Sequence, residues 1–278
     1  MASTLTPLHV PDLLRRHGLR ARKSLGQNFL IDEGALARIV SAASLTVDDT
    51  VLEIGPGLGS LTRHLAIAAQ QVVAVEIDQT LLPVLAEVVA THPNVRVVHA
   101  DILTVDPAEL TEGQRYKVVA NIPYYITSAV IRHLLEARVR PSVIVLTVQR
   151  EVAERICAAP GDLSVLAVSV QAYARAELVA RIPAGAFYPR PDIDSAVVRL
   201  TALPEPVFGS QDADRFFRVV KAGFGQKRKQ LRNALSTGLR QPAQAADVWL
   251  ARAGIDPTRR AETLSLDEWR VLTDAVEL

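Results

Sequence analysis

A short apolar run at 118–120 is followed by four residues whose groups could hold a planar amine: Asn121, Ile122, Pro123 and Tyr124. Proline cannot donate a hydrogen bond to a sheet, so we expect a buried strand to end here. The Asn121 side-chain oxygen and the Ile122 carbonyl could accept both hydrogens of an amine such as N6 of adenine, while the Tyr124 ring stacks on the base. Composition alone would make this stretch a turn with a packed tyrosine. Its position, considered next, favours base methylation.

Three other strand-like runs end in residues suited to a nucleoside. The first leads into a loop with Gly55, Gly57 and Gly59, the second ends in Glu76, and the third ends in Asp101. Glycines permit a tight turn and close approach of a ligand. An acid after the second strand can accept hydrogen bonds from ribose hydroxyls, and an acid after the third can accept one from the adenine amine. Either acid alone could be a helix N-cap. Together with the loop, they favour a nucleoside ligand.

The loop has the spacing G-x-G-x-G, not the G-x-G-x-x-G of dinucleotide folds, and no Walker lysine follows it. A nucleoside without a pyrophosphate therefore fits best, and S-adenosylmethionine is such a ligand. A dinucleotide is the second alternative.

The elements that position these residues alternate between residues 50 and 148. Short β-branched runs, typical of strands buried on both faces, are separated by helix-like segments. This alternation predicts an α/β fold with a mostly parallel, doubly wound sheet. Residues 149–201 add two further strand-like runs, and residues 212–278 have only helical patterns. We expect a basic N-terminal arm (1–24), a Rossmann-like methyltransferase domain (25–205) and a small all-helical domain (206–278).

Composition narrows the class of protein. The chain has 278 residues with 49% hydrophobic and 22% charged residues, as expected for a globular protein. Its one cysteine, Cys157, excludes an intramolecular disulfide and cysteine-rich zinc sites, which suits a reducing cytosol. The six histidines show no metal-ligand spacing, so no metal is expected. No apolar run approaches the roughly 20 residues of a membrane span, and the basic N-terminus lacks the apolar stretch of a secretory signal.

The net charge of +1 conceals two basic segments: the N-terminal arm, whose one acid is Asp12, and residues 221–240, which contain no acid. Such segregation predicts a polyanionic partner, although a solvated helix face would explain either segment alone. The candidate phosphate contacts are Lys221, Lys227, Arg228, Lys229 and Arg232.

Several motifs in sequence order carry a more specific resemblance. They are "KSLGQNFLID", "EIGPGLG", "NIPYYIT", "AFYPRPDIDSAVVRL", "FGQKRKQLRNAL" and "GIDPTRRAETLSLDEW". Over about residues 20–275 the chain resembles the KsgA (RsmA) family of small-subunit ribosomal RNA adenine dimethyltransferases. Ile193 stands where this family usually has valine.

The resemblance implies a role for each matching residue. Asn121 would share the cofactor pocket and position the target amine, with Tyr124 and Phe187 sandwiching the flipped adenine. Without the family, Phe187 could equally be a hydrophobic plug. The implied cofactor contacts are Asn28 and Leu30 in the opening motif, Gly55 and Gly57 in the methionine-side loop, Glu76 at the ribose, Asp101 at the adenine, and Asn121.

The resemblance also implies the reaction: two methyl groups transferred to each of two adjacent adenines near the 3′ end of small-subunit rRNA, with S-adenosylhomocysteine as product and no metal. The implied partner is the small ribosomal subunit and the expected setting the cytoplasm, with a monomer as the default state and a role in subunit biogenesis. Two alternatives stay open. An erythromycin-resistance methylase would modify large-subunit rRNA, but the C-terminal motifs favour the small-subunit enzyme. A non-catalytic RNA-binding assembly factor is disfavoured by the intact site residues.

Overall fold

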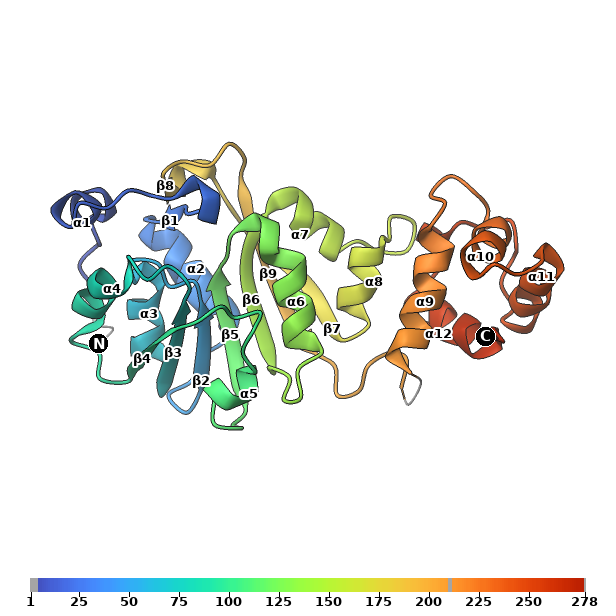
Figure 1. Ribbon diagram of the computed structural model, residues 1–278, viewed down its shortest axis with the longest axis horizontal. Coiled ribbons are helices and arrows are strands. Elements are labelled where there is room, and N and C mark those ends of the chain that lie inside the picture. Colours follow the sequence, from blue (N-terminus) through green and yellow to red (C-terminus); the bar gives the residue numbers. More distant parts are fainter. Residues whose placement is uncertain (1–4, 210–211, 278) are drawn as a thin grey trace. The chain divides into compact units, whose positions relative to one another are not determined.

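The computed structural model describes residues 5–209 and 212–277. The chain forms two compact units (Figure 1). One comprises Met1–Ala153 and Glu177–Ala202, and the other Glu154–Ala176 and Leu203–Leu278. Residues 154–176, expected in the methyltransferase domain, fall in the second unit with the C-terminal helices, and residues 5–24 of the expected basic arm fall within the first unit.

The first unit is built on a seven-stranded sheet with the order β4-β3-β2-β5-β6-β9-β7. The pairs β4–β3, β3–β2, β2–β5 and β5–β6 are parallel, as expected, whereas β9 runs antiparallel to β6. The order reverses between β2 and β5, and ligands of open α/β sheets bind at such a switch point. The strands are β2 (Thr50–Ile54), β3 (Gln71–Glu76), β4 (Val95–His99), β5 (Tyr116–Asn121), β6 (Val143–Gln149), β7 (Ala174–Ile182) and β9 (Ser195–Ala202).

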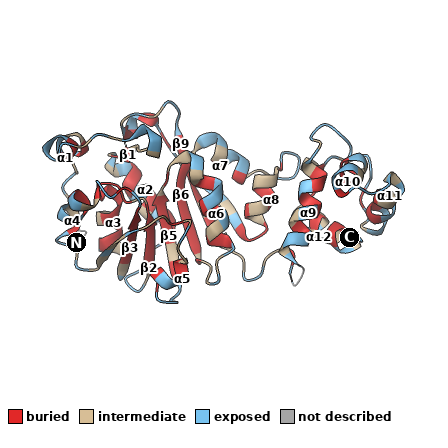
Figure 2. Ribbon diagram, viewed as in Figure 1, coloured by how far each residue is buried: buried red, intermediate tan, exposed pale blue. Residues whose placement is uncertain are grey.

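The central strands are apolar because helices cover both faces of the sheet. Every residue of β2 is buried, and so are all but the first of β3 and all but the last of β6 (Figure 2). Figure 1 shows α6 in front of the strands and α2 behind them. The helices are α2 (Glu33–Ala43), α3 (Ser60–Ala68), α4 (Leu82–Val89), α5 (Pro107–Leu110), α6 (Thr127–Leu135) and α7 (Arg150–Ile156), the last continuing into the second unit. The predicted Rossmann-like fold is confirmed.

The described part of the N-terminal arm, residues 5–24, contains a helix that packs onto the rest of the first unit. Helix α1 (Val10–Arg16) buries Leu13 and Leu14 in an apolar cluster with Phe29 and Leu58, which adjoins the glycine loop. After the short helix η1 (Lys23–Leu25), β1 (Phe29–Leu30) pairs antiparallel with β8 (Phe187–Tyr188). This pairing joins the opening motif to the proline-rich loop, although more than 150 residues separate them in the chain.

The second unit consists of helices packed closely through small residues. An added Cβ at Gly238 of α10 would lie 2.6 Å from the Ala222 Cα of α9, and one at Gly223 would lie 2.5 Å from the Trp269 ring. Trp269 is buried and stacks on Phe224 with 5.5 Å between ring centroids. The elements are α8 (Val165–Gln171), α9 (Ala213–Phe224), α10 (Leu231–Leu239), α11 (Ala243–Arg252), η4 (Ala261–Thr263) and α12 (Leu266–Ala275).

Over residues 5–209 and 212–277, no helix has both the length and the apolar character needed to cross a membrane. Nor do three or more histidine, cysteine or acidic side chains gather there in a way that could hold a metal ion.

Candidate active site

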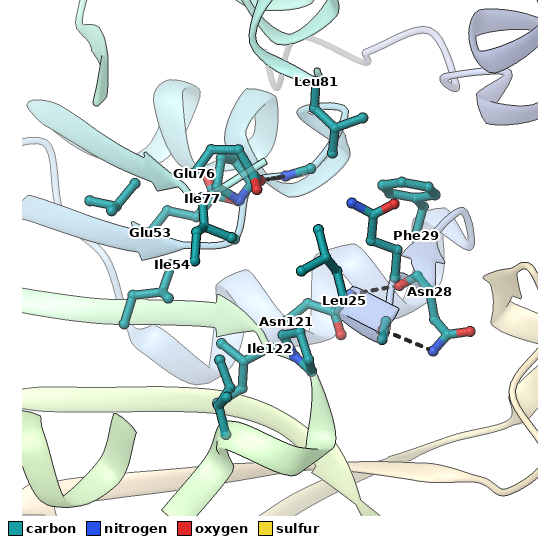
Figure 3. Close-up of a pocket in the computed structure, with 18 of the residues that line it drawn as sticks. Leu25, Asn28, Phe29, Glu53, Ile54, Glu76, Ile77, Leu81, Asn121 and Ile122 are labelled. Atoms are coloured by element: carbon teal, nitrogen blue, oxygen red, sulfur yellow. Dashed lines mark hydrogen bonds between the residues drawn. The ribbon is translucent and has the colours of Figure 1, made fainter. Parts of the chain in front are cut away.

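A pocket of about 250 Å³ opens at the carboxyl ends of β2, β3 and β5 (Figure 3). Its lining comes from the opening motif, the glycine loop, the ends of β3 and β4, the segment 121–126 and Phe187. Every one of these segments lies in the first unit. The structure therefore places around one pocket all the residues predicted for the cofactor and the target base: Asn28, Leu30, Gly55, Gly57, Glu76, Asp101, Asn121, Tyr124 and Phe187.

The glycine loop turns tightly from β2 into α3. Gly55 and Gly57 have positive φ values of 68° and 58°, which favour glycine over other residues. An added Cβ at Gly57 would lie 3.0 Å from the Phe29 ring of β1. The loop thus needs glycine both for its backbone and because the opening motif packs directly against it.

Glu76, the last residue of β3, ties this loop to its own strand. The carboxyl group is buried, and its two oxygens accept from the backbone N–H groups of Gly57 (3.0 Å) and Asp78 (2.8 Å). Burial raises the pKa of Glu76, while the two backbone hydrogen bonds act in the opposite direction. This carboxyl group therefore sets the shape of the glycine loop as well as facing the pocket.

Glu53 is a site residue that the sequence reasoning missed. It lies in β2 with only 1% of its surface exposed, and it lines the pocket. Among the described residues its Oε2 atom has no hydrogen-bond partner, and burial raises the pKa of Glu53 to about 8. A signal was present in the sequence: an acid inside a run otherwise typical of a strand buried on both faces.

Asp101 follows β4 and has one oxygen committed to its own turn. Its Oδ1 accepts from the backbone N–H of Leu103 at 2.9 Å, and the residue is half-buried on the pocket wall. This bond fixes the side chain so that the second carboxyl oxygen is left for a ligand.

The Asn121 amide has a defined orientation. Its Nδ2 donates to the Asn28 backbone carbonyl at 3.1 Å, and the Asn28 Nδ2 donates to the Gly26 carbonyl at 3.2 Å (Figure 3). The tight packing continues at Gly26, where an added Cβ would lie 3.0 Å from the Pro123 Cβ. With its donor engaged by the opening motif, Asn121 keeps its side-chain oxygen as the acceptor for a substrate.

Two aromatic side chains contribute to the same pocket. Tyr124 begins η2 (Tyr124–Ile126), and its hydroxyl lies 2.7 Å from the Ser195 hydroxyl of β9. Burial raises the pKa of the Tyr124 hydroxyl, so it stays protonated at neutral pH. Phe187 enters from β8 and is 3% exposed. The two rings come from segments far apart in the sequence and can bracket a planar group.

Comparison with known proteins decides the family. A family profile described as "Ribosomal RNA adenine dimethylase" matches residues 18–276. The chain belongs to the ribosomal RNA adenine dimethylase family. Proteins named "Ribosomal RNA small subunit methyltransferase A" are similar to it over nearly their full lengths. The one from Dehalococcoides mccartyi strain 195 is 48% identical, covering 98% of this chain and 95% of the relative. The one from Pelotomaculum thermopropionicum is 45% identical, covering 99% and 98%.

Two solved structures are also similar to this chain. A dimethyladenosine transferase from Plasmodium falciparum has a TM-score of 0.76 at 25% identity, covering 88% of this chain and 95% of its own. The 23S rRNA methyltransferase ErmE has a TM-score of 0.71 at 33% identity, covering 90% and 99%.

The predicted phosphate contacts lie in the second unit, and they differ in whether the basic side chain already has an acidic partner. Lys221 is exposed on α9, and the three basic residues at 227–229 are exposed in the turn between α9 and α10. None of these four has an ion pair with any residue in the described part of the chain. Arg232 does: its guanidinium donates to both Asp247 oxygens, at 2.6 and 2.8 Å. Its charge is therefore already balanced within the unit.

Proposed function

We propose that this chain dimethylates N6 of two adjacent adenines near the 3′ end of small-subunit rRNA, with S-adenosylmethionine as methyl donor and a role in small-subunit biogenesis. The observation that carries the proposal is the Asn121 amide, whose donor is engaged by the Asn28 carbonyl beside the pocket and whose acceptor is left for an amine. Family membership and the names of the similar proteins support the choice of substrate.

The pocket residues fit S-adenosylmethionine. Glu53 is a buried acid with an unpartnered oxygen on the pocket wall, which suits a cationic ammonium group. When bound, the cofactor supplies an electrophilic methyl group on a positively charged sulfur. Asn28, just before β1, and Leu30, within it, would contact the cofactor. Gly55 and Gly57 would hold its methionine part, with Glu53 at the ammonium group. Glu76 would accept from the ribose hydroxyls and Asp101 from the adenine amine.

The residues after β5 would act on the target base. The Asn121 side-chain oxygen and the Ile122 carbonyl accept the two amino hydrogens, which favours a pyramidal nitrogen with a more available lone pair. Tyr124 and Phe187 stack on the two faces of the extruded adenine and hold it out of the RNA stack. The amine loses its proton after methyl transfer, so no strong general base is required. The protein would thus act by positioning the target amine rather than by abstracting a proton from it.

The second unit would contact phosphates through Lys221 and the basic turn at 227–229. Phosphate contacts orient a protein on nucleic acid without reading its sequence. Because its charge is balanced by Asp247, we assign Arg232 a smaller share of this binding than its four neighbours. The proposed enzyme acts as a monomer in the cytoplasm.

The decisive experiment measures transfer of labelled methyl from S-adenosylmethionine to small and large ribosomal subunits that lack these modifications, followed by identification of the modified nucleosides. We expect dimethyladenosine at adjacent positions of small-subunit rRNA. Label in the large subunit alone would transfer the assignment to large-subunit methylation. Absence of label in both, with cofactor still bound, would refute catalysis and favour an assembly factor.

A pair of variants tests the division of roles within the site. We expect Asn121→Ala to abolish methyl transfer while retaining more cofactor affinity than Glu76→Ala does. Wild-type turnover in Asn121→Ala would contradict the amine-positioning role.

A further inference from the structure

Ser195 is a polar residue with a specific contact to the candidate site that the proposed chemistry does not use. It is the first residue of β9 and is completely buried. Its hydroxyl lies 2.7 Å from the Tyr124 hydroxyl, the usual distance for an O–H···O hydrogen bond. Its backbone is held in the sheet opposite Gln149 of β6. The bond therefore connects a pocket residue to the end of the paired strands β6 and β9.

The residue before it, Asp194, has a hydrogen bond to the segment that leads to Phe187. The Asp194 Oδ1 accepts from the backbone N–H of Ala184 at 2.9 Å. Ala184 begins the short helix η3 (Ala184–Ala186), whose C-cap is Phe187. The Asp194 carbonyl in turn accepts from the Arg150 N–H at 3.1 Å, just after β6. Two consecutive residues thus reach the segments that carry the two pocket rings.

Tyr124 needs such an anchor because its own segment is short. Helix η2 has three residues and no side-chain cap, and it follows a proline rather than a strand. Tyr124 also lines the pocket, so packing does not enclose it on every side. The hydroxyl lies on the long axis of the ring, so a hydrogen bond there fixes the direction of this axis and with it the place that the ring occupies beside the pocket.

We propose that Ser195 is a positioning residue that holds the Tyr124 ring in the orientation that stacks on the target adenine, while Asp194 sets the turn that leads to Phe187. This inference rests on the proposed function. It adds that the residues at the start of β9 position both aromatic side chains between which the target adenine would stack. Ser195 acts through Tyr124 and does not itself touch the base.

The test is a double-mutant cycle on methyl transfer to unmodified small ribosomal subunits. Ser195→Ala and Tyr124→Phe remove opposite ends of one hydrogen bond while the tyrosine ring is retained. We expect each variant to lower turnover about 3- to 10-fold, the effect of one net hydrogen bond, with cofactor affinity unchanged. The double variant should be no slower than the slower single variant, because the bond can be lost only once.

A matched control comes from the same strand. Thr201 of β9 has a buried hydroxyl without a hydrogen-bond partner among the described residues, so Thr201→Val should keep wild-type turnover. If the fold-loss of turnover in the double variant equals the product of the two single losses, the proposal is overturned, because the two hydroxyls then act independently. Wild-type turnover in either single variant would also overturn the proposal. If Ser195→Ala does not fold, Tyr124→Phe removes the same hydrogen bond and tests it alone. An inactive wild-type protein would instead refute the proposed function.

Discussion

Replacement of Glu76 by glutamine gives a quantitative test of how the cofactor pocket is built. The two carboxyl oxygens accept from different backbone N–H groups, those of Gly57 and Asp78. A glutamine side chain of the same shape has only one acceptor oxygen. Its NH₂ group must therefore face one of the two N–H donors, and that donor is left buried without a partner. Because Gly57 belongs to the glycine loop, the variant loosens the loop that the ligand requires.

The loss can be estimated from this geometry. Hydrogen bonds to charged groups are worth about 1.5–3 kcal/mol, and an unsatisfied buried donor costs a similar amount. If one such bond is lost, the dissociation constant of the cofactor should rise about 10- to 150-fold. The assay is isothermal titration of S-adenosylhomocysteine into the wild type and Glu76→Gln, with a thermal melt to establish that the variant is folded.

Asp106→Asn is the matched control for this change. The Asp106 side chain also accepts from a backbone N–H, that of Ala108 at 2.8 Å, but it lies outside the pocket. Asparagine keeps one acceptor there, so affinity should not change. If folded Glu76→Gln bound within about twofold of the wild type, the argument from the two N–H donors would be wrong.

Three further predictions concern stability, pH and RNA binding. Burial raises the Glu53 pKa to about 8 from 4.5, so the folded state keeps a proton that the unfolded chain releases, and stability without cofactor should fall as pH rises between these values. Glu53→Gln should flatten that part of a melting-temperature profile, and an unchanged slope would contradict the assignment. Reversal of the charges at 227–229 should weaken small-subunit binding and reduce its logarithmic salt slope by up to about 3, whereas an unchanged slope would mean that the turn is merely solvated. Gly238→Ala should destabilise the protein, because overpacking against Ala222 costs about 1–3 kcal/mol while better helix propensity returns only about 1. Thr237→Ala, on the exposed side of the same helix, is the control, and a more stable Gly238→Ala would contradict the close packing.

How far the sequence could predict the site depends on the kind of signal involved. The strand ends at Glu76, Asp101 and Asn121 were predictable, because buried parallel strands have a recognisable composition and their carboxyl ends meet along one edge of the sheet. Glu53 was missed even though it lies in the same motif as the glycines. A strand pattern shows that a residue is buried, but not whether its carboxyl group finds a partner.

Pairings between distant residues needed the structure. The sequence shows six basic residues between 221 and 240, but Asp247, which balances Arg232, lies on the next helix and outside that segment. Residues 154–176 have apolar patterns compatible with either unit, and only their packing assigns them to the helical one.

The sequence alone determined the alternation of strands and helices over residues 50–148, the residue types near the strand ends and the family motifs, because each is a local pattern or a short spacing. Only the tertiary structure decided that β1 pairs with β8, that the Asn28 carbonyl accepts from Asn121, and that the Ser195 and Tyr124 hydroxyls lie within hydrogen-bond distance. These contacts join residues between 71 and 159 positions apart. The physical reason is that local periodicity describes one element at a time, whereas the pocket forms where the packed sheet brings the ends of several elements together.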